Sequence, residues 1–180
     1  MISFLCPLYL IYMVLYMKLI FMPIINDDHY LAFCSVVLTI SAICGGPFWG
    51  HIGDKMGFKK TLLVVLLVDI SCKVLGLFCT EKYNLFLLYF FLGFNDKGIL
   101  TIIGPGLIDI FGLEMATELI PYKGLSVFLA YIMVPVVQLV ASSYLTYTTI
   151  LTLFIVCTMV AVALGYYFFK KVNYIPHGMK

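Results

Sequence analysis

The chain has 180 residues, of which 63% are hydrophobic and 11% charged, and its formal net charge is +2. Soluble globular proteins contain about 45–50% apolar and about 25% charged residues, so 11 basic and 9 acidic side chains cannot cover a soluble domain of this size. With a mean hydropathy of +1.09, the composition excludes a soluble enzyme, a nucleic-acid-binding module and a disordered tail. It predicts an integral membrane protein.

The distribution of apolar residues predicts how often the chain crosses a membrane. A helix needs about 20 mostly apolar residues to cross roughly 30 Å of hydrocarbon. Six stretches reach this length, so we predict an all-α integral membrane protein with six transmembrane helices in a single domain, residues 1–180. The predicted spans cover about residues 2–25, 30–49, 61–79, 85–111, 124–145 and 149–169.

Polar segments separate the predicted spans. We expect turns at residues 26–29 and 80–84, and polar loops at residues 51–60 and 112–123. The fourth span is expected to be interrupted, because charged residues near its middle and a Gly-Pro-Gly sequence one to two turns later both weaken a membrane helix. Pro135 predicts a bend in the fifth span.

The lysines predict the orientation of the chain, which contains no arginine. With six spans, both termini and the two polar loops lie on one side of the membrane. The lysines of that side are Lys55, Lys59, Lys60, Lys123, Lys170, Lys171 and Lys180. The opposite side has Lys82, with Lys18 close enough to the end of its span to reach the interface. The positive-inside rule therefore places the N- and C-termini in the cytosol.

Two ionisable residues lie within the third predicted span. Asp69 and Lys73 are four residues apart, on one face of a helix, with the acid on the N-terminal side that favours pairing. Charges at membrane depth are costly and usually face a protein interior or a water-filled cavity. Two interpretations stay open: an ion pair that only makes insertion tolerable, or a proton- or substrate-linked pair that lines a pathway.

The fourth predicted span carries Asn95, Asp96 and Lys97 near its middle. Adjacent residues of a helix point about 100° apart, so Asp96 and Lys97 cannot both be shielded by one neighbouring helix. These residues are therefore candidates for a water-filled pathway. The alternative is a buried ion pair with another helix, for which Asp69 and Lys73 are the obvious partners.

The remaining chemistry-bearing residues lack the spacing of a site. The six cysteines lie in or beside apolar stretches without C-x-x-C spacing, which favours packing roles. His29, His51 and His177 have no partners at metal-ligand spacing. No metal site, cofactor site, nucleophile–base set or nucleotide loop is predicted, so we do not expect an enzyme. Gly46 and Gly50 have the spacing of an ordinary helix-contact pair.

The segment that joins the second and third predicted spans reads GHIGDKMGFKKT, from Gly50 to Thr61. Its glycines suit a tight reversal, its aspartate can accept from exposed N–H groups or pair with a lysine, and its lysines can anchor to the cytosolic leaflet. The spacing resembles the signature loop of the major facilitator superfamily of transporters, G-x-L-a-D-[RK]-x-G-[RK]-[RK]. The residues that match it or extend its basic run are Gly50, Asp54, Lys55, Gly57, Lys59 and Lys60.

This resemblance implies one half of the superfamily's twelve-span fold, made of two three-helix repeats of inverted topology. Residues 93–112, which end in Asp109-Ile-Phe-Gly112, resemble the tenth helix of oxalate/formate antiporter-like and monocarboxylate-porter-like members, and hence their C-terminal half. The basic residues that hold the anion in that branch are missing. Gly46 occupies the first of these positions, and residues 124–145 contain neither Lys nor Arg, which argues against dicarboxylate exchange.

The function implied by the resemblance is transport of a small solute, with organic anions among the candidates, by alternating access of two halves around a central site. A half-length chain would need a homodimer or a missing six-helix half as its partner, in addition to membrane lipid, and no nucleic acid. The candidate pathway residues are Asp69, Lys73, Asn95, Asp96 and Lys97. The alternative function is a non-transporting membrane interaction subunit or a degenerate, truncated transporter copy.

Overall fold

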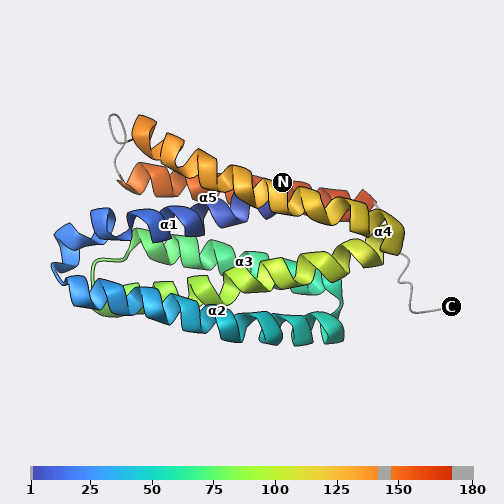
Figure 1. Ribbon diagram of the computed structural model, residues 1–180, viewed down its shortest axis with the longest axis horizontal. Helices are drawn as coiled ribbons and strands as arrows, with labels where there is room; N and C mark the ends of the chain where they lie inside the picture. Colours follow the sequence, from blue (N-terminus) through green and yellow to red (C-terminus); the bar gives the residue numbers. More distant parts are fainter. Residues whose placement is uncertain (1, 142–146, 172–180) are drawn as a thin grey trace.

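The computed structural model describes residues 2–141 and 147–171, and these ranges contain helices but no strand, so the described fold is all-helical. The helices lie side by side along the long axis of an elongated bundle (Figure 1). They are α1 (Ile2–Ile25), α2 (Asp28–Met56), α3 (Phe58–Leu77), α4 (Lys82–Ala141) and α5 (Tyr147–Lys171). Asp27 caps the N-terminus of α2, where its side chain accepts a hydrogen bond from the backbone N–H of Tyr30.

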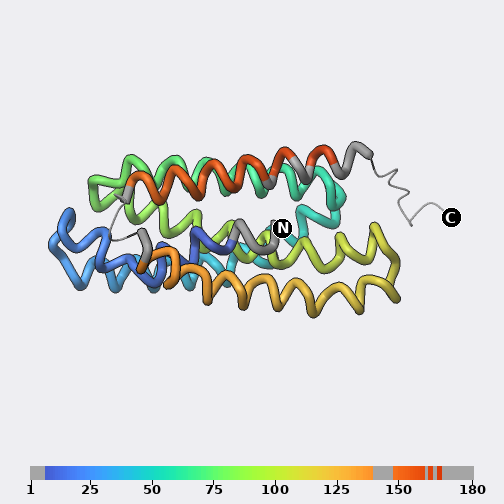
Figure 2. Tube along the Cα trace, turned by 90° about the horizontal axis from the view of Figure 1, so that it is seen from above, coloured from blue at the N-terminus to red at the C-terminus, as the bar shows by residue number. Residues whose placement is uncertain are grey.

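The longest helix, α4, folds back on itself. Gly112 has φ 80° and ψ 167°, a backbone conformation that is essentially confined to glycine. The chain reverses direction at this end of the bundle, as Figures 1 and 2 show. Residues 82–111 form the first arm of α4, and residues 113–141 form its second arm, which returns along the bundle.

The connections at this end are much shorter than the sequence predicts. Only Gly57 separates α2 from α3, so the predicted loop at residues 51–60 is wrong. The Gly57 N–H donates to the Gly53 carbonyl at 2.9 Å, and the Thr61 hydroxyl donates to the Gly57 carbonyl at 3.0 Å. The predicted loop at residues 112–123 is also wrong, because the chain is helical again from residue 113. A glycine with positive φ reverses the chain without an extended loop.

The first arm of α4 is helical through both predicted interruptions, residues 95–97 and 104–106. Two contacts account for this difference. The Asn95 side chain donates to the Val65 carbonyl of α3 at 3.1 Å, so this polar residue is directed into the bundle. A Cβ atom at Gly106 would overlap the ring of Phe58, so this glycine permits close packing instead of breaking the helix.

Glycines also bring the first arm of α4 close to α2. A Cβ atom at Gly45 of α2 would overlap the backbone of Phe94, and a Cβ atom at Gly93 of α4 would overlap the carbonyl of Leu38. The two backbones therefore approach at distances that only glycine allows, as in small-residue contacts between membrane helices.

Several helices are compatible with a membrane protein. Among the described residues, the helical stretches long and apolar enough to cross a membrane are Pro7–Ile25, Asp28–Met56 and Lys82–Leu139, and the last of these includes both arms of α4. The apolar part of α5, Thr148–Val160, is shorter. Helix α3 is not among these stretches because it contains four charged residues, Lys59, Lys60, Asp69 and Lys73. Large apolar side chains also cover the outside of the bundle, including Ile43 and Leu139, which are 70% and 74% exposed.

Polar contacts tie the opposite end of the bundle together. The Lys82 ammonium lies 2.5 Å from the Asp27 carboxylate, and the Tyr30 hydroxyl donates to the Lys82 carbonyl at 2.6 Å. The Lys18 ammonium lies 2.6 Å from the Asp28 carboxylate on the surface. The contacts of Lys82 join the turn between α1 and α2 to the beginning of α4, and the contact of Lys18 joins α1 to α2.

The contact between Asp27 and Lys82 predicts how stability depends on pH. The Lys82 ammonium, and next the Tyr30 N–H, hold the pKa of Asp27 below its usual value of 3.8. A lowered folded-state pKa means that the contact stabilises the protein fully above the unfolded-state pKa and is lost as the pH falls through the folded-state pKa. We expect the difference in unfolding temperature between wild type and Asp27→Asn to be constant from neutral pH to about pH 5 and to shrink below about pH 4. Thermal unfolding in detergent measures it, and a difference that grows on acidification would contradict the assignment.

Candidate functional site

The predicted pair on α3 forms a buried ion pair. Lys73 has no solvent exposure and Asp69 is 6% exposed. The Lys73 ammonium donates to the Asp69 carboxylate at 2.6 Å and to the Thr158 hydroxyl of α5 at 2.7 Å. It also lies 5.5 Å from the centre of the Tyr9 ring of α1. The predicted contact is therefore present, and groups from three helices surround the positive charge.

Asn95 of the first arm of α4 lies beside this pair. It is 2% exposed, and its side-chain nitrogen donates to the carbonyl of Val65, one helical turn before Asp69 on the same face of α3. Its side-chain oxygen receives no hydrogen bond from any described residue. A buried acceptor without a hydrogen bond lowers the free energy of unfolding by about 1–3 kcal/mol.

The next two residues of the first arm differ in their surroundings. Asp96 is half-buried and interacts electrostatically with Lys97 and with the charges of Asp69 and Lys73. Lys97 is exposed. The structure therefore buries Asp69, Lys73 and Asn95 side by side, with Asp96 half-buried near them, and leaves Lys97 exposed beside Asp96. We call the first four of these residues, together with Thr158, the interior polar cluster, which thus consists of Asp69, Lys73, Asn95, Asp96 and Thr158.

The sequence does not identify three of the polar groups found inside the bundle. Thr158 lies in an apolar stretch with several other threonines, and Tyr9 is one of 13 tyrosines, so no spacing distinguishes them. Lys123, predicted in a cytosolic loop, is half-buried and donates to the Leu100 carbonyl at 2.6 Å. It reaches that carbonyl because the second arm of α4 begins directly after Gly112 and runs back along the first.

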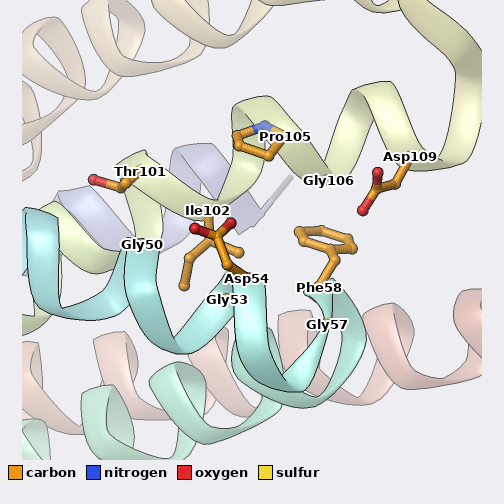
Figure 3. Close-up of a pocket in the computed structure, with 10 residues that line it drawn as sticks. All are labelled: Gly50, Gly53, Asp54, Gly57, Phe58, Thr101, Ile102, Pro105, Gly106 and Asp109. Carbon is orange, nitrogen blue, oxygen red and sulfur yellow. The ribbon is translucent and has the colours of Figure 1, made fainter. Parts of the chain in front are cut away.

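The segment that resembles the transporter signature forms one side of a cavity of about 310 Å³. The cavity lies between the junction of α2 with α3 and the first arm of α4 (Figure 3). The carboxylates of Asp54 and Asp109 lie on either side of the Phe58 ring in this view. The lining residues are Gly50, Gly53, Asp54, Gly57, Phe58, Thr101, Ile102, Pro105, Gly106 and Asp109.

The charged residues of this segment remain near the surface at the end of the bundle. Lys55 and Lys60 are exposed and Lys59 is half-buried. On the side toward α4, Cβ atoms added at Gly46 and Gly50 would each lie 3.5 Å from the Thr101 side chain. The predicted contact pair of glycines thus faces α4, although the overlaps of an added Cβ with backbone atoms occur at Gly45 and Gly93.

The backbone conformation of Gly57 predicts that replacing this glycine destabilises the folded protein. Its φ of 79° and ψ of 157° lie in the region that is essentially restricted to glycine. We expect Gly57→Ala to lower the free energy of unfolding by about 1–3 kcal/mol. The matched control is Gly124→Ala, because an added Cβ has no neighbour within 4 Å there, and it is expected to leave stability unchanged or slightly higher. Equal stability of the two variants in denaturant titrations would contradict the assigned turn.

Comparison of the chain with known proteins gave no match to any protein-family model, curated protein or solved structure. The resemblance to the major facilitator superfamily therefore rests on the residues of the signature segment and of residues 93–112.

Proposed function

We propose that the chain is a multi-pass membrane transporter unit that moves a small solute by alternating access. In this proposal it crosses the membrane six times, as one six-helix half of a major facilitator-like fold with two three-helix repeats. The two arms of α4 support six crossings, because they add a sixth helical segment to α1, α2, α3 and α5. The lysines near Gly57 support a cytosolic location for that end of the bundle.

The observation that carries this proposal is the interior polar cluster. Long apolar helices enclose two carboxylates, a fully buried ammonium, an amide and a hydroxyl, contributed by α3, α4 and α5. Polar groups at membrane depth are expensive and commonly mark solute or ion pathways. A cluster assembled from separate helices can bind a solute between elements that move relative to one another.

A second six-helix unit completes the proposed transporter, either a second copy of this chain or another half within a longer protein. Lys97 supports such a partner. It is exposed near the middle of the first arm of α4, where contact of its charge with lipid would be unfavourable. A second unit, with a hydrated site between the two, would shield this charge from lipid.

Uptake by proteoliposomes tests the proposal. Radiolabelled oxalate, formate and lactate serve as first probes, because small organic anions are the solutes implied by the resemblance. We expect uptake by wild type to exceed that of protein-free liposomes, and uptake by the double variant Asp69→Leu/Lys73→Met to fall to the protein-free level. Equal uptake by the two proteins would show that the cluster is not the solute site.

The second candidate is a non-transporting membrane interaction subunit. It is favoured by the position of the cavity, which lies at the α2–α3 junction and has none of the cluster residues in its lining. It is also favoured by the hydrogen bonds to Asp69 and Thr158 that already occupy two of the three N–H groups of Lys73. For such a subunit we expect no uptake of any probe by wild type, and an unchanged set of bound proteins for the folded double variant.

A further inference from the structure

Two cysteines from different segments meet at the end of the bundle opposite to Gly57 and Gly112. Cys34 lies on α2, one turn after Tyr30, and Cys79 lies in the turn between α3 and α4. This turn and the turn between α1 and α2 are at the same end of the bundle (Figure 1). Cys34 has no solvent exposure, Cys79 is 5% exposed, and both belong to one hydrophobic cluster. Within this cluster the two thiols are close enough to interact electrostatically.

The polar contacts at this end hold the two cysteines near each other. The Tyr30 hydroxyl donates to the Lys82 carbonyl at 2.6 Å and also interacts with the Cys34 thiol. Lys82 follows Cys79 by three residues, and its ammonium contacts the Asp27 carboxylate. The helix that carries Cys34 and the turn that carries Cys79 are therefore fastened to each other beside the thiols.

The position of this pair suits oxidation. In the proposed orientation, its end of the bundle faces away from the cytosol, and disulfides form and persist in extracellular, periplasmic and lumenal compartments. Burial in apolar surroundings keeps a cysteine in its unreactive thiol form, so reaction follows local opening of this end. Cys79 lies in a non-helical turn between the exposed residues Phe78 and Thr80. It is therefore the first of the two cysteines to meet an oxidant.

We propose that Cys34 and Cys79 are a redox-active pair that forms a disulfide, with a small disulfide such as oxidised glutathione as the oxidant. The deprotonated Cys79 sulfur attacks one sulfur of the oxidant, breaks its S–S bond and releases one glutathione thiolate. The deprotonated Cys34 sulfur then attacks the Cys79 sulfur of the mixed disulfide and displaces the second glutathione thiolate. The two protons lost by the cysteines go to the two glutathione thiolates, so two cysteine thiols are oxidised and one glutathione disulfide is reduced.

The new bond fastens α2 covalently to the turn between α3 and α4. This inference goes beyond the proposed function and shares with it only the orientation of the chain, since disulfide formation does not require that the protein transports a solute.

Peptide mapping of the full chain in lipid nanodiscs tests the inference. The protein is incubated with oxidised glutathione or with dithiothreitol, then denatured, labelled with a maleimide, digested and analysed by mass spectrometry. We expect oxidised wild type to lose the labels of Cys34 and Cys79 together and to yield a cross-linked peptide pair that contains both. Cys79→Ala is expected to yield no such peptide pair. The matched control Cys72→Ala replaces a buried cysteine that has the charges of Asp69 and Lys73 as neighbours, and it is expected to form the same cross-link as wild type.

The wild-type measurement does not depend on how well any variant folds. Labels retained on both Cys34 and Cys79 after oxidation would overturn the inference. A glutathione adduct that persists on either cysteine, or a cross-link between two copies of the chain, would also overturn it, because the second thiol would then be out of reach. Solute uptake is measured separately. Uptake without the cross-link would reject only the cysteine pair, and the cross-link in a protein that takes up no probe would reject only the proposed transport.

Discussion

Replacing Lys73 with methionine is expected to lower the free energy of unfolding by about 3–5 kcal/mol. The substitution preserves much of the side-chain volume but leaves the Asp69 carboxylate, which is 6% exposed, without the ammonium that lies 2.6 Å from it. An unpaired buried charge is penalised far more than the pair itself stabilises the protein. Denaturant titration in detergent, with far-ultraviolet circular dichroism as the signal, measures the effect.

The double variant Asp69→Leu/Lys73→Met is the control for this prediction. Replacing both partners of a buried ion pair with apolar residues is often neutral or even stabilising by about 1–4 kcal/mol. Thr158 keeps a partner in this variant, because its hydroxyl also donates to the Phe154 carbonyl at 2.8 Å. We therefore expect the double variant to be close to wild type in stability. A double variant as unstable as Lys73→Met would show that the ion pair is not the cause.

Gly93→Ala is expected to lower the free energy of unfolding by about 3 kcal/mol, at the upper end of the range for overpacked cores. The added Cβ would overlap the Leu38 carbonyl and the Ser41 hydroxyl of α2. A backbone carbonyl cannot rotate away as a flexible side chain can, so α2 and the first arm of α4 must separate. Denaturant titration measures the loss, and chemical cross-linking between α2 and α4 measures the separation.

Gly104→Ala is the matched control, since it lies in the same arm and an added Cβ has no neighbour within 4 Å. Alanine is about 1 kcal/mol more favourable than glycine within a helix, so this variant is expected to be unchanged or more stable. If Gly93→Ala and Gly104→Ala had the same stability, close packing between α2 and α4 would not be a source of stability.

The sequence predicts the helices of this protein better than the connections between them. Long apolar stretches specify helices directly, since a membrane helix must satisfy its backbone hydrogen bonds within itself. Segments 51–60 and 112–123 resemble loops because they contain charges and glycines, yet each reverses at one glycine with positive φ, Gly57 or Gly112. Polar residues near a reversal can extend a helix or form a loop. Tertiary contacts decide between the two, and the hydropathy of the sequence contains no information about these contacts.

The candidate site was only partly predictable for a related reason. The spacing of Asp69 and Lys73 predicts their contact, because residues i and i+4 are neighbours on any helix. The approach of Thr158, 85 residues beyond Lys73, depends on how α5 packs on α3. Hydropathy does not encode this packing, and a lone threonine in an apolar helix gives no signal. The same limit applies to Lys123, whose position follows from the reversal at Gly112.

The most direct test of the account is whether α3 crosses a membrane with its buried ion pair inside it. Single cysteines are introduced at Lys60, Glu81 and Glu114, which are all exposed, in a variant without the native cysteines, and a membrane-impermeant maleimide is applied to each side of sealed vesicles. The account predicts that cysteines at 60 and 114 react from one side and the cysteine at 81 reacts only from the other. Reaction of the cysteines at 60 and 81 from the same side would contradict it.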